Sequence, residues 1–353
     1  MDDIIKCTYI EGAILELRTK SRCDLKVDEK TIPCKIIKFF EPSTLSCAME
    51  VELLDRSQDK RAMLKLFDRR FASQLRSDYK IGPSTVTKEA TYRDFVKSGD
   101  ASQFVHRLRR DYEFEEPEEG WDTGQNESYL YDLCLDMHET EKTVYQKLDQ
   151  LHGKEIPRLL AQVQLQPTME SMQGMPIDSI EFFKINGLLL EHIDGYTLSD
   201  IPTKAPREDW GIICHQAVQV VRLLDDYSIR NEDVRPSNIM VTGGTAQDDY
   251  RVVMLDFAQC VFREPDETDK QWGRKKWNQD EEGAIGLVMR QRLKKLDYDW
   301  EFEHSNHFLE WAEGESPSDN SDNGEDPELE TSRPYKLLVS VTSRYQIQQI
   351  DKR

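Results

Sequence analysis

The chain lacks long apolar runs, closely spaced cysteines and an excess of basic residues, and each absence excludes a class of protein. None of its 353 residues lies in a stretch that approaches the ~18 consecutive apolar positions of a membrane helix. Its seven cysteines are scattered and odd in number, which offers no zinc-ligand spacing and suits a reducing compartment. A net charge of −20 argues against a general binder of nucleic acid or of anionic membranes.

The charged runs and the start of the chain point the same way. The basic runs Arg107–Arg110 and Arg274–Lys276 are short and lie in an acidic chain, so we interpret them as solvated surface charge. The start, Met1-Asp2-Asp3, has no basic region followed by an apolar leader. We therefore expect a protein of the cytoplasm or nucleus that binds neither nucleic acid nor membrane.

Residue patterns predict strands first and helices later. Apolar and β-branched residues bounded by turns predict strands between Thr31 and Phe67, at 157–163 and at 187–193. Apolar residues at helical spacing predict three helices, in Glu127–Leu151, Trp210–Asp225 and Asp280–Leu293. Between about 78 and 125, charged residues interspersed with Gly and Pro predict an insertion with one or two helices.

This order predicts an α+β protein in which a β-rich lobe precedes a helical lobe. Helix-forming sequence runs out soon after Leu296, so the helical lobe is expected to be reduced. The residues that follow are rich in Ser, Asp, Glu and Gly, which predicts disorder. The expected segments are an N-terminal extension (1–30), an N-lobe with the insertion (31–193), a C-lobe (194–312), a disordered acidic linker (313–335) and a C-terminal tail (336–353).

The most informative pattern is Asp233 followed five positions later by Asn238, and then Asp256 at the end of an apolar run. Each residue alone is ordinary in a turn. Together, with Pro236 in the loop, they match the order in which a kinase-like phosphotransferase places its base and its metal ligands. Such an enzyme positions a hydroxyl against the terminal phosphate of ATP and neutralises charge with Mg²⁺.

Longer phrases of the chain extend this match. With the motifs above, they resemble the protein kinase-like superfamily, and most closely a group of fungal protein-kinase-like proteins related to aminoglycoside and choline phosphotransferases. The resemblance covers roughly Thr31 to Leu296. It implies a two-lobed protein kinase-like fold with a small antiparallel β-rich N-lobe and a reduced helical C-lobe. The phrases that carry it are Leu64–Phe71, Tyr145–Pro157, Asn231–Asn238, Leu255–Cys260 and Asp280–Gly286.

The resemblance implies roles for the residues around the first motif. Asp233 would be the general base that accepts the hydroxyl proton. Asn238 and Asp256 would hold Mg²⁺ through hard oxygen ligands. Arg235 stands where the family usually has lysine and would steady the transferred phosphate.

Lys65 is the residue that the resemblance assigns to the α- and β-phosphates of ATP. The alternative places it on the exposed face of an alternating strand, with Leu64 and Leu66 on the other. Glu141 would pair with this lysine, and Glu139 is the competing candidate. Either glutamate could instead be an ordinary solvent-facing helix charge.

The segment Leu190-Glu191-His192-Ile193 would be the hinge whose main chain meets adenine. A buried strand is equally compatible with these four residues. Asp280, Glu281 and Glu282 are open to two interpretations, a brace for the catalytic loop or simply a helix N-terminus.

Two departures from the family pattern leave the activity open. No glycine lies between Phe39 and Cys47, where a phosphate-covering glycine loop is expected. Asn231-Glu232 stands in place of His-Arg, so switching by loop phosphorylation is not expected. The expected function is transfer of the γ-phosphate of ATP to a protein or small-molecule hydroxyl. The alternative is a pseudokinase that acts as an interaction module.

Overall fold

The computed structural model describes residues 2–19, 30–55, 60–111, 113–167, 173–244 and 250–308. The predicted acidic linker and C-terminal tail lie outside these residues. The described chain divides into two compact units. Among the described residues, the first unit holds those up to Gly153 and Pro157–His192, and the second holds Lys154–Ile156 and those from Ile193 to 308. The residue pattern predicts the boundary between the expected lobes after Ile193.

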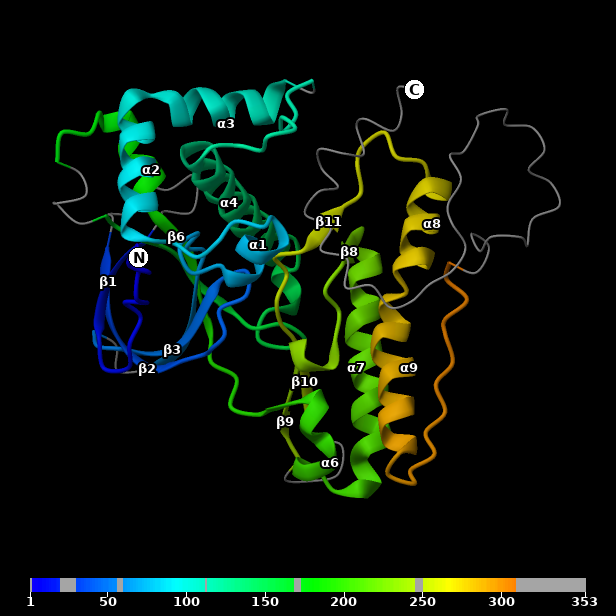
Figure 1. Cartoon of the computed structure of the whole chain (residues 1–353). Coiled ribbons are helices and arrows are strands. Elements are labelled where there is room, and N and C mark those ends of the chain that lie inside the picture. Colours follow the sequence, from blue (N-terminus) through cyan, green and yellow to red (C-terminus); the bar gives the residue numbers. More distant parts are fainter. Residues whose placement is uncertain are drawn as a thin grey trace, which may run out of the picture. The chain divides into compact units, whose positions relative to one another are not determined.

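The first unit is built on a closed barrel of six antiparallel strands in the order β1-β2-β3-β4-β6-β5. The mixed α and β content and the antiparallel pairing of the early strands agree with expectation. β1 lies within the segment expected to be an N-terminal extension, yet it pairs with both β2 and β5 and closes the barrel. The strands are β1 (Ile14–Thr19), β2 (Thr31–Phe39), β3 (Cys47–Leu53), β4 (Arg61–Leu66), β5 (Leu159–Leu165) and β6 (Ile185–Glu191) (Figure 1).

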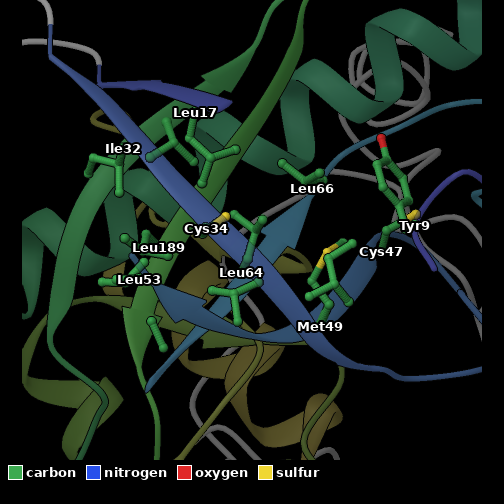
Figure 2. Packing of buried hydrophobic residues seen from close by; sticks show 14 residues of the cluster. Tyr9, Leu17, Ile32, Cys34, Cys47, Met49, Leu53, Leu64, Leu66 and Leu189 are labelled. Atoms are coloured by element: carbon green, nitrogen blue, oxygen red, sulfur yellow. The ribbon is translucent and has the colours of Figure 1, made fainter. Parts of the chain in front are cut away.

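Alternation along the strands fills the barrel with apolar side chains. Leu64 and Leu66 of β4 are fully buried among side chains of the neighbouring strands, including Met49 and Leu189 (Figure 2). Each such side chain contributes roughly 1.5–3 kcal/mol when removed from water. Because successive residues of a strand point to opposite faces, Lys65 lies on the outside of the barrel.

Within the described residues, four α-helices accompany the barrel in the first unit, and the predicted insertion supplies two of them. The helix predicted for Glu127–Leu151 begins four residues before its expected start, because Asp122 and Gln125 form a capping box. The Oδ1 of Asp122 accepts from the main-chain N of Gln125 at 2.9 Å, and the side chain of Gln125 accepts in return at 3.0 Å. The helices are α1 (Ser73–Asp78), α2 (Val86–Ser98), α3 (Asp100–Arg110) and α4 (Thr123–Lys147).

The second unit is mainly helical. Its long helices α7 and α9 lie side by side (Figure 1). The predicted apolar face of α7 is buried, from Ile213 to Leu224. None of the described helices is both long and apolar enough to cross a membrane. The elements are β7 (Tyr196–Thr197), α6 (Ile201–Lys204), α7 (Trp210–Asp226), β8 (Ile229–Asn231), β9 (Ile239–Gly243), β10 (Tyr250–Met254), β11 (Cys260–Phe262), α8 (Asp269–Gln279) and α9 (Glu281–Lys294).

Candidate active site

A short loop of the second unit brings Asp233, Arg235 and Asn238 into contact. The loop leaves β8, makes a 3₁₀ turn at Pro236–Asn238 and enters β9. The Nδ2 of Asn238 donates to Oδ2 of Asp233 and to its main-chain oxygen, both at 2.9 Å. The Nη2 of Arg235 lies 3.2 Å from the same Oδ2. An amide and a guanidinium therefore both orient the carboxylate of Asp233.

Asp256 lies at the same end of the β9–β10 hairpin as Asn238. The register pairs Ile239 with Met254, and the main-chain N of Leu255 donates to the main-chain oxygen of Asn238 at 2.8 Å. Asp256 follows directly with a left-handed backbone, φ 62°. Aspartate tolerates this conformation better than most residues, because its short polar side chain can hydrogen-bond locally. The two expected metal ligands therefore occupy adjoining ends of two paired strands.

Asn231 connects these two groups, and the sequence analysis missed this role. Its Oδ1 accepts from the main-chain N of Asp233 at 2.9 Å. Its Nδ2 donates to the main-chain oxygen of Asp256 at 3.2 Å. The sequence held one signal for this role: an asparagine two residues before Asp233 can form an Asx turn with that N–H. Its amide also carries a donor for a second segment.

A buried ion cluster supports Asn231 from behind. Oε1 of Glu281 accepts from the main-chain N of Asn231 at 2.7 Å. The Nζ of Lys276 contacts Oε2 of Glu281 and lies 2.6 Å from Oδ1 of Asp225 and 3.0 Å from the main-chain oxygen of Ile229. Three helices, α7, α8 and α9, thus reach the strand that leads into the loop of Asp233 and Asn238.

The three acidic residues at the start of α9 have different roles. One braces the neighbouring loop, and the others fit an ordinary helix N-terminus. Glu281 braces the loop of Asp233 through Asn231. Asp280 is the N-cap of α9, and its Oδ1 accepts from the main-chain N of Gly283 at 3.0 Å. Glu282 faces away from the loop and pairs with Arg222 at 2.7 Å.

Replacing Glu281 with glutamine is expected to lower the free energy of unfolding by about 1–3 kcal/mol, since Lys276 loses one of its two carboxylates. Burial raises the pKa of both Glu281 and Asp225 in the folded protein. Above the ordinary glutamate value of 4.5, the folded state therefore holds more protons than the unfolded state. Stability contributed by these groups falls as pH rises through the raised pKa values.

The glutamine variant removes one of these titrations, so its unfolding free energy should depend less on pH above 4.5. Urea unfolding at a series of pH values measures both effects. Glu282→Gln is the matched control, because Glu282 pairs with Arg222 and not with Lys276. An unchanged stability and pH slope for Glu281→Gln would contradict the brace.

In the first unit, Lys65 forms a buried ion pair with Glu141. The Nζ of Lys65 lies 2.6 Å from Oε2 of Glu141, and the two side chains are 11% and 1% exposed. The ammonium also lies 5.5 Å from the centroid of the Phe67 ring. Lys65 is on the outer face of its strand, as the alternative proposed, but α4 covers that face. The lysine is therefore not a solvated surface charge.

Glu139, the competing candidate, does not pair with Lys65 in the structure. It contacts Lys142 on the same helix and Nδ1 of His138 at 3.1 Å. The hydrogen bond with His138 is the main cause that lowers the pKa of Glu139 to about 2. Its side chain is 45% exposed, so it is the surface charge of the two.

The four hinge candidates lie at the end of β6 and in the turn to the second unit. Leu190 is buried and pairs with Met63 of β4, so this part is a buried strand. Glu191 ends the strand, and its main-chain N donates to the oxygen of Arg158 at 2.9 Å. His192 lies 3.7 Å from Oε2 of Glu50, and Ile193 begins the second unit. Contact with adenine stays a prediction.

The glycine-free loop between β2 and β3 is attached to the start of α1. The main-chain N of Ser73 donates to the main-chain oxygen of Ser43 at 3.2 Å, and that of Gln74 donates to the main-chain oxygen of Thr44 at 3.0 Å. The hydroxyl of Ser73 donates to the oxygen of Ser43 as well. These bonds hold the loop in one conformation, without the backbone freedom that glycines would give.

The predicted donor set for a metal ion consists of Asn238 and Asp256. Within the described ranges, no group of three or more His, Cys, Asp or Glu side chains could hold a metal by itself. Mg²⁺ in phosphate-binding sites takes one or two protein carboxylates and completes its shell with phosphate oxygens and water. Two protein oxygens fit that coordination. Oδ1 of Asn238 accepts from Nε of Arg235 at 3.2 Å, so metal binding there would replace this contact.

Comparisons with known proteins place no family on this chain. No protein-family model matches it, and no curated protein matches it. Solved structures that it resembles include the Rio2 kinase of Chaetomium thermophilum in an ADP/Mg²⁺-phosphoaspartate complex. That match has 13% sequence identity and a TM-score of 0.43, and it covers 78% of this chain but only 61% of that kinase. A likeness at this level assigns no role to any residue here.

Proposed function

We propose that the chain is an ATP- and Mg²⁺-dependent phosphotransferase of protein kinase-like fold, which transfers the γ-phosphate to a hydroxyl of a protein or small molecule. The observation that carries the proposal is the ion pair of Lys65 and Glu141, whose carboxylate is 1% exposed. A lysine in an apolar strand, held by a glutamate 76 positions later, fits the phosphate-orienting pair of such enzymes.

The loop residues of the second unit have chemistry that suits the transfer step. Asp233 accepts the proton of the attacking hydroxyl, and Asn238 and Arg235 fix the direction of its carboxylate. Positioning of this kind supplies much of the rate in phosphoryl transfer, since the protein itself makes no covalent bond. Arg235, with a side chain that is 47% exposed, is accessible to a phosphate and steadies the transferred group.

Lys65 contacts the α- and β-phosphates, and Glu141 keeps its ammonium directed at them. Asn238 and Asp256 would hold Mg²⁺, which neutralises charge on the phosphate oxygens when bound. The net charge of −20 repels a free nucleotide anion. Local cations at Lys65 and Arg235 therefore have to offset that repulsion.

A thermal-shift experiment tests the proposal. A ligand that binds only the folded state raises its stability by about 2.7 kcal/mol at a concentration of 100 Kd. ATP with Mg²⁺ is therefore expected to raise the Tm by several degrees, since 1 kcal/mol shifts the Tm of a domain of about 150–250 residues by about 2–4 °C and that of a larger chain by less. ATP without Mg²⁺ should raise it less.

Lys65→Met is expected to lose most of this shift. Lys35→Met is the matched control, because Lys35 is an exposed lysine of strand β2 in the same barrel. Absence of any shift in the unsubstituted protein, or an equal shift in Lys65→Met, would overturn the proposal.

A further inference from the structure

A buried cluster of four ionised residues, here called the clamp, joins the segment after β4 to the start of α4. It consists of Arg69, Arg76, Glu89 and Glu127. The two Nη atoms of Arg69 donate to the two carboxylate oxygens of Glu89 at 2.7 Å each, and Nη1 also contacts Glu127. The two Nη atoms of Arg76 donate to the oxygens of Glu127 at 2.9 and 2.7 Å.

The clamp is closed to solvent at its centre. The side chains of Arg69, Arg76 and Glu127 are 8%, 4% and 1% exposed. Two arginines face two glutamates, so the charges balance. The forked contacts allow one relative placement of the chain segments, whereas an apolar cluster of the same volume could slide. Ion clusters of this kind add little net stability, so their effect is on geometry.

Both helices of the insertion pack on α4 beside the clamp. The guanidinium of Arg69 lies 3.8 Å from the centroid of the Tyr92 ring of α2. A Cβ at Gly124, in the first turn of α4, would lie 2.6 Å from Cγ of Phe95 of α2. Arg109 of α3 lies 2.6 Å from Oδ1 of Asp132 of α4. The insertion therefore contacts α4 over its first turns.

Helix α4 is attached to the region from β4 to α2 at two separate points, through the clamp and through the Lys65–Glu141 pair. Arg69 follows Lys65 by four residues, and Glu141 follows Glu127 by 14 residues on α4 (141 − 127). Fourteen residues span about 21 Å of helix and return to within about 40° of the same face. Attachment at two points fixes both the position and the tilt of α4 against the barrel.

We propose that the clamp and the insertion are positioning elements, which hold α4 where Glu141 meets Lys65 without a separate activating event. The part of this inference that links the Lys65–Glu141 pair to ATP rests on the phosphotransferase function proposed above. The positioning itself is a property of the first unit. Arg69, Glu89 and Glu127 are thus positioning residues that act through Glu141.

The first test needs no nucleotide. Cys134 lies on α4 between Glu127 and Glu141 and is 3% exposed, whereas Cys214 of α7 is fully buried in the second unit. Alkylation of each thiol, followed by mass spectrometry, reports local opening. In Glu127→Gln and in Glu89→Gln, Cys134 is expected to react about fivefold faster or more, with Cys214 unchanged.

Controls and a second variant keep the test decisive. Glu139→Gln is the matched control on the same helix, because Glu139 pairs only with its own helix neighbours in the described contacts. If Glu127→Gln fails to fold, Cys214 reacts too. Glu89→Gln then provides the test. The Glu89 side chain is 22% exposed and its substitution leaves the Arg76–Glu127 contacts in place, so this variant is expected to fold.

The second test measures Mg²⁺-dependent ATP affinity by calorimetry. Glu127→Gln is expected to weaken it about tenfold alone, but to cause no further loss in a Glu141→Gln background, since the pair is already broken there. Equal losses in both backgrounds, or unchanged Cys134 reactivity in both clamp variants, would overturn the inference. If Cys134 reacts faster in the clamp variants but the native protein does not bind ATP, the positioning role is supported and the phosphotransferase proposal is contradicted.

Discussion

Replacing Asp233 with asparagine is expected to slow phosphoryl transfer by about 10²–10⁴-fold while nucleotide affinity stays within about twofold. Asparagine has nearly the same size, and its side-chain oxygen can still accept the hydrogen bond that Asn238 donates at 2.9 Å in the native loop. The loop therefore keeps its shape. An amide oxygen is far less basic than a carboxylate, so the hydroxyl proton has no acceptor.

The rate is measured as ATP hydrolysis or autophosphorylation, because neither assay needs an identified acceptor. Asp226→Asn is the matched control, since Asp226 is an exposed aspartate at the end of α7 in the same unit. Retention of activity in Asp233→Asn would remove the general-base assignment. A native protein that binds ATP with Mg²⁺ but shows no turnover would instead favour the pseudokinase alternative.

Replacing Asp256 with asparagine is expected to weaken ATP binding in the presence of Mg²⁺ by about 100-fold, or roughly 2.8 kcal/mol. The substitution keeps a side-chain oxygen but removes the negative charge of Asp256, and the other predicted ligand, Asn238, is a neutral amide. Asparagine tolerates the left-handed backbone at this position, φ 62°, better than alanine does. The contact from Asn231 is to the main-chain oxygen of Asp256, so it survives.

Calorimetric titration of ATP with and without Mg²⁺ separates a metal effect from a folding effect. Without Mg²⁺, the variant and the native protein should bind ATP equally weakly. Asp280→Asn is the matched control, because Asp280 also has a positive φ, 49°, and asparagine is an equally good N-cap. If Mg²⁺ improves ATP binding in Asp256→Asn as much as in the native protein, Asp256 is not a metal ligand.

Sequence spacing predicts those parts of the site that a single turn or a single periodic element brings together. Asp233 and Asn238 lie five residues apart, so one loop places them in contact. Helix α7 repeats its apolar face at every turn, and its observed end at Asp226 is one residue beyond the predicted one. The strands were predictable for the same reason, since the alternation of buried and exposed side chains along a strand is a local pattern.

Contacts between distant segments could not be predicted in this way. Glu139 and Glu141 lie two positions apart on one helix, and only the packing of α4 on the barrel buries Glu141 and leaves Glu139 exposed. The brace from Glu281 to Asn231 joins residues 50 positions apart. Its sequence signature, an acid in the first turn of a helix, is shared with ordinary helix starts.

The closure of the barrel by β1 makes the first 19 residues indispensable to the stability of the native fold. β1 pairs on one side with β2 and on the other with β5. A chain trimmed before Thr31 would expose two rows of unpaired main-chain N–H and C=O groups, one on each of these strands. Such open edges pair with strands of other molecules, so N-terminal truncation is expected to promote intermolecular aggregation.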